Sequence, residues 1–192
     1  MKSLAVFCGS STGNFPIYME EARRLGERLA AEGITLVYGG STVGCMGAVA
    51  DAVLEGGGKV IGVIPKSLKD VEIAHERLTE LHVVEDMHER KALMAKHADG
   101  FVALPGGAGT LEEWFEVFTW AQLGYHQKPC ALLSVNEYYQ PLISLFDHMV
   151  EQGFLKKEFK DLVLIEKDSD ILIDRIKNYQ ANYQPKWSER RK

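Results

Sequence analysis

Long apolar stretches are absent from this sequence, and no run approaches the roughly 18 consecutive apolar residues that a membrane-spanning helix needs. The apolar run at residues 4–8 ends at Cys8 and is too short for the core of a secretion signal. The three cysteines, Cys8, Cys45 and Cys130, lack the paired spacing of zinc or redox motifs. We therefore expect a cytoplasmic protein with reduced cysteines and no membrane contact.

An excess of positive charge is also missing. The chain has 22 lysines and arginines against 27 aspartates and glutamates, a formal net charge of −5. This balance argues against a general nucleic-acid-binding protein, which is normally basic. It does not argue against a phosphate-bearing small molecule, because backbone amides and a few local cations are enough to hold a phosphate.

Three common catalytic or nucleotide motifs begin in this sequence but are incomplete. Residues 107–109 start a GxGxxG pattern whose sixth position is Glu112, and residues 9–13 lack the Lys-Ser or Lys-Thr of a P-loop. His88-Glu89 starts an HExxH pattern that ends at Ala92. These absences argue against a dinucleotide-dependent dehydrogenase, a P-loop NTPase and a zinc protease. The other histidines have no ligand spacing, so we expect no metal.

What the sequence does have is a regular alternation of short apolar runs and helix-period segments. The runs predict strands at 4–9, 34–38, 59–64, 81–84, 100–104, 129–135 and 162–165. The periodic segments predict helices at 17–32, 46–54, 87–98, 111–123, 138–152 and 171–179. Residues 65–79 are the least regular stretch, which favours a mobile loop.

This alternation predicts an α/β protein: a single-domain, Rossmann-like, doubly wound parallel sheet with helices on both faces. We expect this domain to span residues 1–184 and to be followed by a polar, basic tail at 185–192 that frays. Sheets of this kind bind ligands beyond the carboxyl ends of their strands.

Three of the predicted strand ends are rich in glycine: residues 9–13, 39–47 and 106–110. Glycines at equivalent strand ends suggest that the backbone must approach a ligand closely. The candidate ligand-binding residues in these loops are Gly9, Ser10, Gly39, Gly40, Gly106, Gly107, Gly109 and Thr110.

The most informative segment is Pro-Gly-Gly-Ala-Gly-Thr-Leu-Glu-Glu at residues 105–113, between a predicted strand and a helix. Backbone N–H groups and the positive end of the helix dipole would face one point there, where a phosphate fits and Thr110 can add a hydroxyl. A purely structural alternative is that Thr110 caps the helix and Glu113 closes a capping box.

Charged residues follow on two predicted helices. Arg90 and Lys91 begin the first helix, where adjacent cations are commonly surface residues. On the second, Glu113, Glu116 and Thr119 recur every three residues and can share one face. Glu112 points about 100° away, toward solvent or a local ion-pair partner. We expect the aromatic residues of this helix to be packing groups; they are Trp114, Phe115, Phe118 and Trp120.

Together, Met87-His-x-Arg90-Lys91 and the 105–113 segment resemble the signature of the LONELY GUY (LOG) family of cytokinin riboside 5′-monophosphate phosphoribohydrolases. The segments at 37–40, 44–47, 60–65 and 119–124 agree, so that the resemblance covers most of residues 4–150. Members of this family have often been labelled lysine decarboxylases, but no lysine here can be singled out to hold pyridoxal phosphate.

The resemblance implies hydrolysis of a nucleoside 5′-monophosphate, AMP or a cytokinin riboside monophosphate, to free base and ribose 5-phosphate by a homodimer without cofactor. It implies that Arg90 and Glu113 are the catalytic pair. The implied nucleotide site comprises residues 107–110 with Met87, Lys91, Glu116 and Thr119. Ser67 or Leu68 falls where plant members have a substrate-contacting glutamate. The alternatives are a nucleotide-sensing module without turnover and a phosphotransferase or ligase.

Overall fold

The computed structural model describes residues 1–69 and 74–186. Its seven strands are β1 Ser3–Phe7, β2 Thr35–Tyr38, β3 Val60–Pro65, β4 Glu80–Val84, β5 Phe101–Ala103, β6 Cys130–Leu133 and β7 Val163–Glu166. The helices are α1 Ile17–Ala31, α2 Gly44–Glu55, α3 Lys66–Lys69, α4 Met87–His97, α5 Ala108–Leu123, α6 Gln140–Glu151, α7 Lys157–Lys160 and α8 Ser169–Lys177, with a 3-10 turn, η1, at Val135–Glu137.

The strands form one sheet in the order β4-β3-β2-β1-β5-β6-β7, and every pair of neighbouring strands is parallel. The chain builds outward from β1 to one edge and then returns to add β5, β6 and β7 on the other side. The predicted α/β, doubly wound, Rossmann-like fold is confirmed. The reversal of strand order falls between β1 and β5, which is where such sheets bind their ligands.

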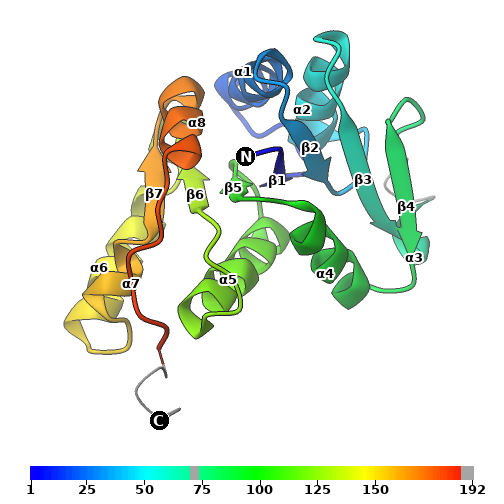
Figure 1. The fold of residues 1–192 in the computed structure, drawn as a ribbon. Helices are drawn as coiled ribbons and strands as arrows, with labels where there is room; N and C mark the ends of the chain where they lie inside the picture. Colours follow the sequence, from blue (N-terminus) through cyan, green and yellow to red (C-terminus); the bar gives the residue numbers. More distant parts are fainter. Residues whose placement is uncertain (70–73, 187–192) are drawn as a thin grey trace.

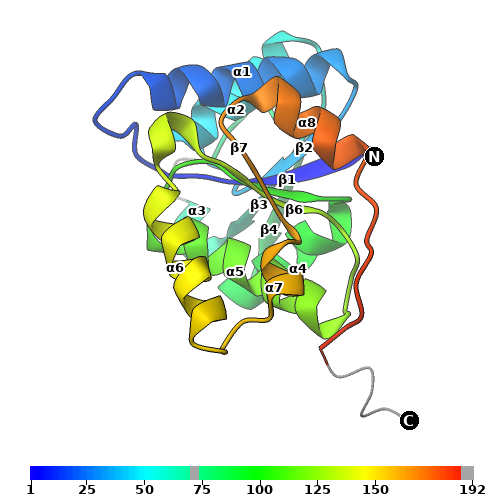
Figure 2. The same ribbon diagram turned by 90° about the vertical axis from the view of Figure 1, so that its left-hand side faces the viewer.

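Alternating residues of each strand point to opposite faces of the sheet and pack into two separate hydrophobic cores. Leu4 and Val6 of β1 pack toward one face with α1, α2 and α8, whereas Ala5 and Phe7 pack toward the other face with α4, α5, α6 and α7. Figure 2 shows the two helical layers above and below the sheet. Because both faces are covered, the strands read as continuous apolar runs, as expected of a buried parallel sheet.

Short elements account for most differences from the sequence expectation. The turns α3, η1 and α7 were not predicted, because segments of three or four residues are too short for a periodic pattern. The loop prediction for residues 65–79 is wrong at its start, where Pro65 ends β3 and Lys66–Lys69 is helical. Residues 70–73 lie outside the described residues.

The predicted tail can be followed only in part. Lys186 donates its backbone N–H to the carbonyl of Gln122 at 2.8 Å, and Pro185 lies against Gly124 just beyond α5. Residues 187–192, the rest of the predicted basic tail, lie outside the described residues. Among the helices that are described, none is both long and apolar enough to cross a bilayer.

Because all the strands are parallel, their carboxyl ends lie at the same edge of the sheet, with α4 and α5 on one face and α1 on the other (Figure 1). The three glycine-rich loops that the sequence singled out follow β1, β2 and β5, three adjacent strands. The fold therefore brings together loops that are about 30 and 60 residues apart in the chain.

Candidate active site

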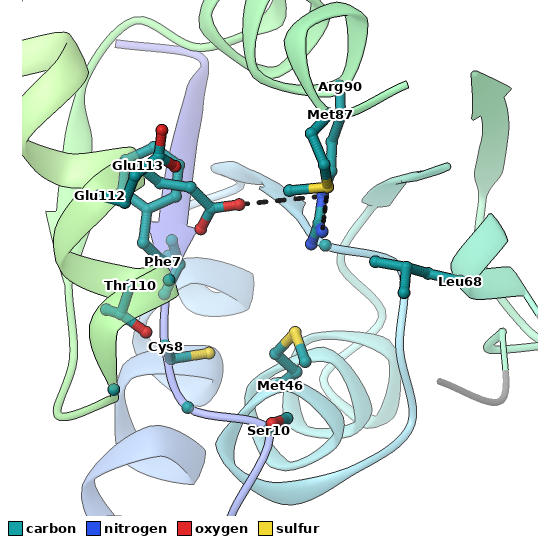
Figure 3. Close-up of a pocket in the computed structure, with 15 residues that line it drawn as sticks. Phe7, Cys8, Ser10, Met46, Leu68, Met87, Arg90, Thr110, Glu112 and Glu113 are labelled. Carbon is teal, nitrogen blue, oxygen red and sulfur yellow. Dashed lines mark hydrogen bonds and ion pairs between the residues drawn. The ribbon is translucent and has the colours of Figure 1, made fainter. Parts of the chain in front are cut away.

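A cavity of about 240 Å³ opens at the carboxyl ends of β1 and β2, beneath the first turns of α4 and α5 (Figure 3). Nine residues selected from the sequence line it: Gly9, Ser10, Gly39, Met87, Arg90, Gly107, Gly109, Thr110 and Glu113. The two residues expected to do the chemistry thus share a cavity with the loop expected to hold the phosphate.

Backbone hydrogen bonds hold the glycine-rich loops against one another. The N–H of Gly9 donates to the carbonyl of Pro105 at 3.1 Å, and the N–H of Cys45 donates to the carbonyl of Gly9 at the same distance. The Tyr138 hydroxyl donates to the carbonyl of Gly106 at 2.6 Å. A Cβ at Gly106 would lie 2.8 Å from the backbone nitrogen of Gly9 and overlap the Thr110 hydroxyl. Glycine is therefore required where these two loops meet.

The α5 helix begins at Ala108, three residues earlier than the sequence suggested, and Gly107 is its N-cap. Thr110 therefore lies inside the first turn, and the alternative in which Thr110 caps the helix and Glu113 closes a capping box is wrong. Within the described residues, no side chain caps this helix. Its first N–H groups have no partner inside the helix, and they face the cavity with the positive end of the dipole.

Two glycines of this loop are not explained by packing. A Cβ at Gly107 or Gly109 would meet no atom of residues 1–69 or 74–186 within 4 Å, and both residues line the cavity. Gly109 also sits in a helix, where glycine is less favourable than alanine by roughly 1 kcal/mol. Because the protein itself leaves this space open, the small residues are best explained by a ligand that comes close to the backbone.

Arg90 and Glu113 face each other across the cavity from α4 and α5 (Figure 3). Arg90 Nε lies 3.8 Å from Glu113 Oε1, and the two side chains are only 7% and 11% exposed. The separation is an ion pair but too long for a hydrogen bond. The buried Nε of Arg90 makes no hydrogen bond to any described residue. This donor therefore lies within ion-pair distance of Glu113 but is not satisfied by it.

The surroundings of Arg90 explain its position. Asp86 is the N-cap of α4, and its carboxylate accepts hydrogen bonds at 2.9 Å from the N–H groups of His88 and Glu89. The hydrogen bond from Glu89 is the main reason that the pKa of Asp86 is lowered. On the far side, a Cβ at Gly39 would overlap Nη2 of Arg90. The guanidinium thus packs directly against Gly39, the residue that follows β2.

Five predicted site residues do not line this cavity: Gly40, Lys91, Gly106, Glu116 and Thr119. Lys91 instead turns to α5, where its Nζ pairs with Glu112 and lies 3.3 Å from Glu116 Oε2. Glu112 is therefore the ion-pair partner that its place on the helix suggested, and it also reaches the cavity rim. The backbone carbonyl of Gly40 accepts a hydrogen bond from the His75 N–H at 2.9 Å.

Several cavity residues were not selected from the sequence as site residues: Val6, Phe7, Cys8, Met46, Leu68 and Glu112. Most are apolar and match the core pattern of their strand or helix, so only their place at the end of β1 or the start of α2 could have indicated them. Burial, followed by the neighbouring Cys45 and Glu113, raises the pKa of the Cys8 thiol, which is therefore neutral at pH 7.

The remaining sequence-selected groups are structural. Trp114 is buried, donates its indole N–H to the carbonyl of Ala131 at 2.9 Å, and stacks on Phe118, so the prediction that these aromatics pack is confirmed. His75 is a buried histidine hydrogen-bonded to Asp51. Within residues 1–69 and 74–186, no group of three histidine, cysteine, aspartate or glutamate side chains could hold a metal.

A second cavity, of about 340 Å³, adjoins the first on the α1 side of the sheet. The two cavities share Gly9, Ser10 and Gly107, and the second is bounded by the rings of Tyr18 and Tyr138. The described residues that line it include no arginine, lysine, aspartate or glutamate. The charged chemistry of the site is thus confined to the first cavity, on the side of α4 and α5.

The fold and the cavity define a class of protein: a Rossmann-like protein with an uncapped helix N-terminus beside a buried arginine–glutamate pair. A family model described as "Possible lysine decarboxylase" matches residues 46–176.

The cytokinin riboside 5′-monophosphate phosphoribohydrolase of Rhodococcoides fascians is 50% identical to this chain over 178 residues, which are 92% of this chain and 90% of the relative. LOG1 of Arabidopsis thaliana, with the same activity in its name, is 48% identical over 183 residues, 95% of this chain and 86% of the relative. The chain belongs to the LOG family.

Solved structures agree on the fold. The molybdenum cofactor binding protein of Rippkaea orientalis superposes with a TM-score of 0.69 over 92% of this chain and 96% of that one, at 22% identity. The molybdenum cofactor carrier protein of Chlamydomonas reinhardtii gives a TM-score of 0.70 with the same coverage and identity. At this identity the likeness supports the architecture and says nothing about ligands.

Proposed function

We propose that this protein hydrolyses the N-glycosidic bond of a purine nucleoside 5′-monophosphate, such as AMP or a cytokinin riboside monophosphate, and that Glu113 and Arg90 carry out the reaction. The protein is a phosphoribohydrolase by family, and its products are the free base and ribose 5-phosphate. The observation that supports the residue assignment is the buried Arg90–Glu113 pair, which faces the same cavity as the open N-terminus of α5.

The 5′-phosphate binds at the start of α5 in this proposal. The free N–H groups after Gly107 and the Thr110 hydroxyl donate to its oxygens, and the helix dipole favours its charge. Gly107 and Gly109 leave the space that the phosphate occupies. Binding energy from this end of the nucleotide aligns the scissile bond, which lies away from the anchor.

The ribose then lies below Glu113. As the bond from C1′ to the base nitrogen breaks, its electron pair leaves with the base, and C1′ acquires positive charge that the Glu113 carboxylate stabilises. The oxygen of a water molecule bonds to C1′, and Glu113 accepts the water proton and passes it to solvent. The base nitrogen takes up a proton from solvent. Arg90 keeps Glu113 ionised and donates to the sugar or the phosphate.

The base lies at the opposite end of the cavity, where the side chains of Met46, Leu68 and Met87 form an apolar wall (Figure 3). Flexible thioether side chains adapt to flat rings and to alkyl substituents. By the family resemblance, Ser67 or Leu68 falls where plant members have a glutamate, and of these two it is Leu68 that lines the cavity. This wall is compatible with both an unmodified purine and a purine with an apolar substituent.

Chromatographic analysis of products tests the assignment. Purified protein incubated with AMP or with isopentenyladenosine 5′-monophosphate should release the free base, and Glu113→Gln should lower kcat by at least about a hundredfold while it still binds the nucleotide. Glu151→Gln, at an exposed end of α6, is the matched control and should keep full turnover. A fully active Glu113→Gln protein would remove Glu113 from the mechanism.

The same assay separates the rival functions. A nucleotide-sensing module would bind AMP and return it unchanged, and a phosphotransferase would move the phosphate rather than release the base. Neither a nucleotide-sensing module nor a phosphotransferase gives the buried Arg90–Glu113 pair a role. A panel of nucleoside monophosphates, diphosphates and unphosphorylated nucleosides would then identify the preferred substrate, and the monophosphates should have the highest kcat/KM.

We also propose that the protein is a cytoplasmic homodimer. All three cysteines are free and buried, which suits a reducing compartment. Apolar side chains are exposed at Leu81 and Val83 on the edge strand β4 and at Met87 on α4. Such surface is commonly covered in an assembly. Light scattering after size exclusion should give twice the 21.5 kDa chain mass, and a fluorescent fusion should distribute through the cytoplasm.

A further inference from the structure

Lys91 is a buried cation next to Arg90 that does not enter the cavity. Its side chain is 9% exposed, and its Nζ pairs with Glu112 and with Glu116, which are one turn apart on α5. Burial by itself would lower the pKa of Lys91, but the hydrogen bonds and charges of these two carboxylates outweigh it and raise the pKa. Lys91 is therefore a fixed positive charge between the two helices.

The α5 helix presents three carboxylates to two cations of α4. Glu112 and Glu116 lie on either side of Glu113 in the sequence, and both are held by Lys91, whereas Glu113 pairs with Arg90. Glu116 is three residues from Glu113 and four from Glu112, spacings at which like charges on one helix repel one another. Without a second cation, Glu112, which reaches the cavity rim, and Glu113 would compete for the same guanidinium.

We propose that Lys91 is a positioning residue, which holds Glu112 and Glu116 so that Arg90 is left for Glu113 and the substrate. The inference rests on the proposed roles of Arg90 and Glu113. Lys91 therefore has a different role from Arg90. Lys91 acts on the carboxylates of α5 and does not contact the nucleotide.

The charged and titratable groups around Glu113 predict the direction of the effect. Among the groups that the structure describes near Glu113, Arg90 from α4 favours the ionised carboxylate, Glu112 and Glu116 from α5 oppose it, and the Cys8 thiol, directly after β1, is neutral. Removal of Lys91 leaves Glu112 and Glu116 uncompensated, which raises the pKa of Glu113. Because the reaction needs ionised Glu113, the acidic limb of the rate profile should then move to higher pH.

Four variants test the proposal through kcat, KM and the pH profile. Lys91→Met should lower kcat roughly tenfold, with little change in KM, and should move the acidic limb of kcat upward by about one pH unit. Lys91→Arg should behave like the wild type. The triple variant K91M/E112Q/E116Q, which removes the cation and both carboxylates, should return the limb to its original position. Lys128→Met removes a partly buried lysine that bonds α4 at the carbonyl of Ala95, and it should leave both kcat and the profile unchanged.

An NMR titration of the Glu113 side-chain carboxyl carbon gives a measurement that does not depend on turnover. The pKa of Glu113 should rise in Lys91→Met and return in the triple variant. If the wild type releases no base but this pattern is found, the proposed function fails and the role of Lys91 stands. If the wild type is active and Lys91→Met keeps its kcat and profile, the inference is overturned. It is equally overturned if Lys91→Arg is as impaired as Lys91→Met, or if the triple variant does not recover.

Discussion

At the residue scale, the glycines of the site fall into two kinds that substitution can separate. Gly39 and Gly106 are small because other protein atoms fill the space: Arg90 in the first case, Thr110 and Gly9 in the second. Gly107 and Gly109 are small although the protein leaves their space empty. The first kind lets neighbouring atoms pack against the backbone, and in the proposed function the second leaves room for the phosphate.

Gly109→Ala should therefore raise stability and weaken substrate binding. The helix gains roughly 0.5–1 kcal/mol, because alanine is a better helix former than glycine and nothing obstructs its Cβ. The same methyl group enters the proposed phosphate site, so KM for AMP should rise at least about tenfold. Urea unfolding and steady-state kinetics measure the two effects. Unchanged KM would place the phosphate elsewhere.

Gly39→Ala should lower kcat more than it changes KM, the reverse of the effect of Gly109→Ala. The new Cβ would overlap Nη2 of Arg90, so the guanidinium must move away from Glu113. We expect kcat to fall at least about tenfold with a smaller change in KM, because the phosphate anchor is not touched. A crystal structure of the variant should show Arg90 displaced. A kcat equal to that of the wild type would mean that catalysis does not need the guanidinium of Arg90 in its observed position against Gly39.

How far the sequence predicted these residues depends on their chemistry. Arg90 and Glu113 were selected because they stand in motifs that resemble those of a known family, and both line the cavity. Cys8 and Met46 could not, because an apolar residue at a strand or helix end looks the same whether it lines a cavity or fills a core. Lys91 was assigned to the nucleotide site by resemblance, and only the side-chain geometry shows that it turns toward Glu112 and Glu116.

At the element scale, the first turns of α4 and α5 position the site, and they begin in different ways. The α4 helix has a side-chain cap at Asp86, whereas α5 begins at Gly107 without one. A capped start fixes Arg90 in place, and an uncapped start leaves N–H groups free for an anion. The sequence placed the start of α4 correctly and that of α5 three residues late, because Thr110 followed by Glu113 imitates a capping box.

Asp86→Ala should loosen α4 and reduce activity together. The variant loses both hydrogen bonds to the N–H groups of His88 and Glu89, and we expect the melting temperature to fall by about 2–4 °C and kcat to fall several-fold. Asp168→Ala is the matched control, because Asp168 caps α8 in the same way, away from the cavity. It should lower the melting temperature similarly and leave kcat unchanged.

The Asp86 cap also predicts how its contribution to stability depends on pH in the acidic range. The pKa of Asp86 is lowered in the folded protein, mainly by the hydrogen bond from the N–H of Glu89. Its contribution to stability is therefore complete above the ordinary pKa of an aspartate, near 4, and is lost as the pH falls through the lowered value. The difference in melting temperature between wild type and Asp86→Ala should accordingly be constant at neutral pH and shrink below about pH 4. A constant difference down to pH 2 would show that Asp86 does not act as a charged cap.

At the scale of the whole molecule, the order of elements determined where the site could be. Alternating strands and helices predicted a parallel sheet, and the glycine-rich ends of β1, β2 and β5 predicted its functional edge. The sequence did not reveal which strands are neighbours. That β1 lies between β2 and β5 follows from packing of strands distant in the chain, and it is this adjacency that joins Gly9 to Pro105.

The same buried sheet makes the molecule sensitive to alkali. Burial raises the pKa of the thiols of Cys8, Cys45 and Cys130, so they stay protonated in the folded state when the unfolded chain already ionises them, above about pH 8.5. The unfolded state then binds fewer protons than the folded state, and the free energy of unfolding must fall as the pH rises. For each thiol that stays fully protonated in the folded state, the free energy of unfolding should fall by up to about 1.4 kcal/mol per pH unit.

Urea unfolding with reductant present should therefore show stability declining between pH 8 and 10. The Cys130→Ala variant, although less stable at pH 7, should decline less steeply. Equal slopes for the two proteins would mean that Cys130 ionises in the folded sheet and is not protected by burial.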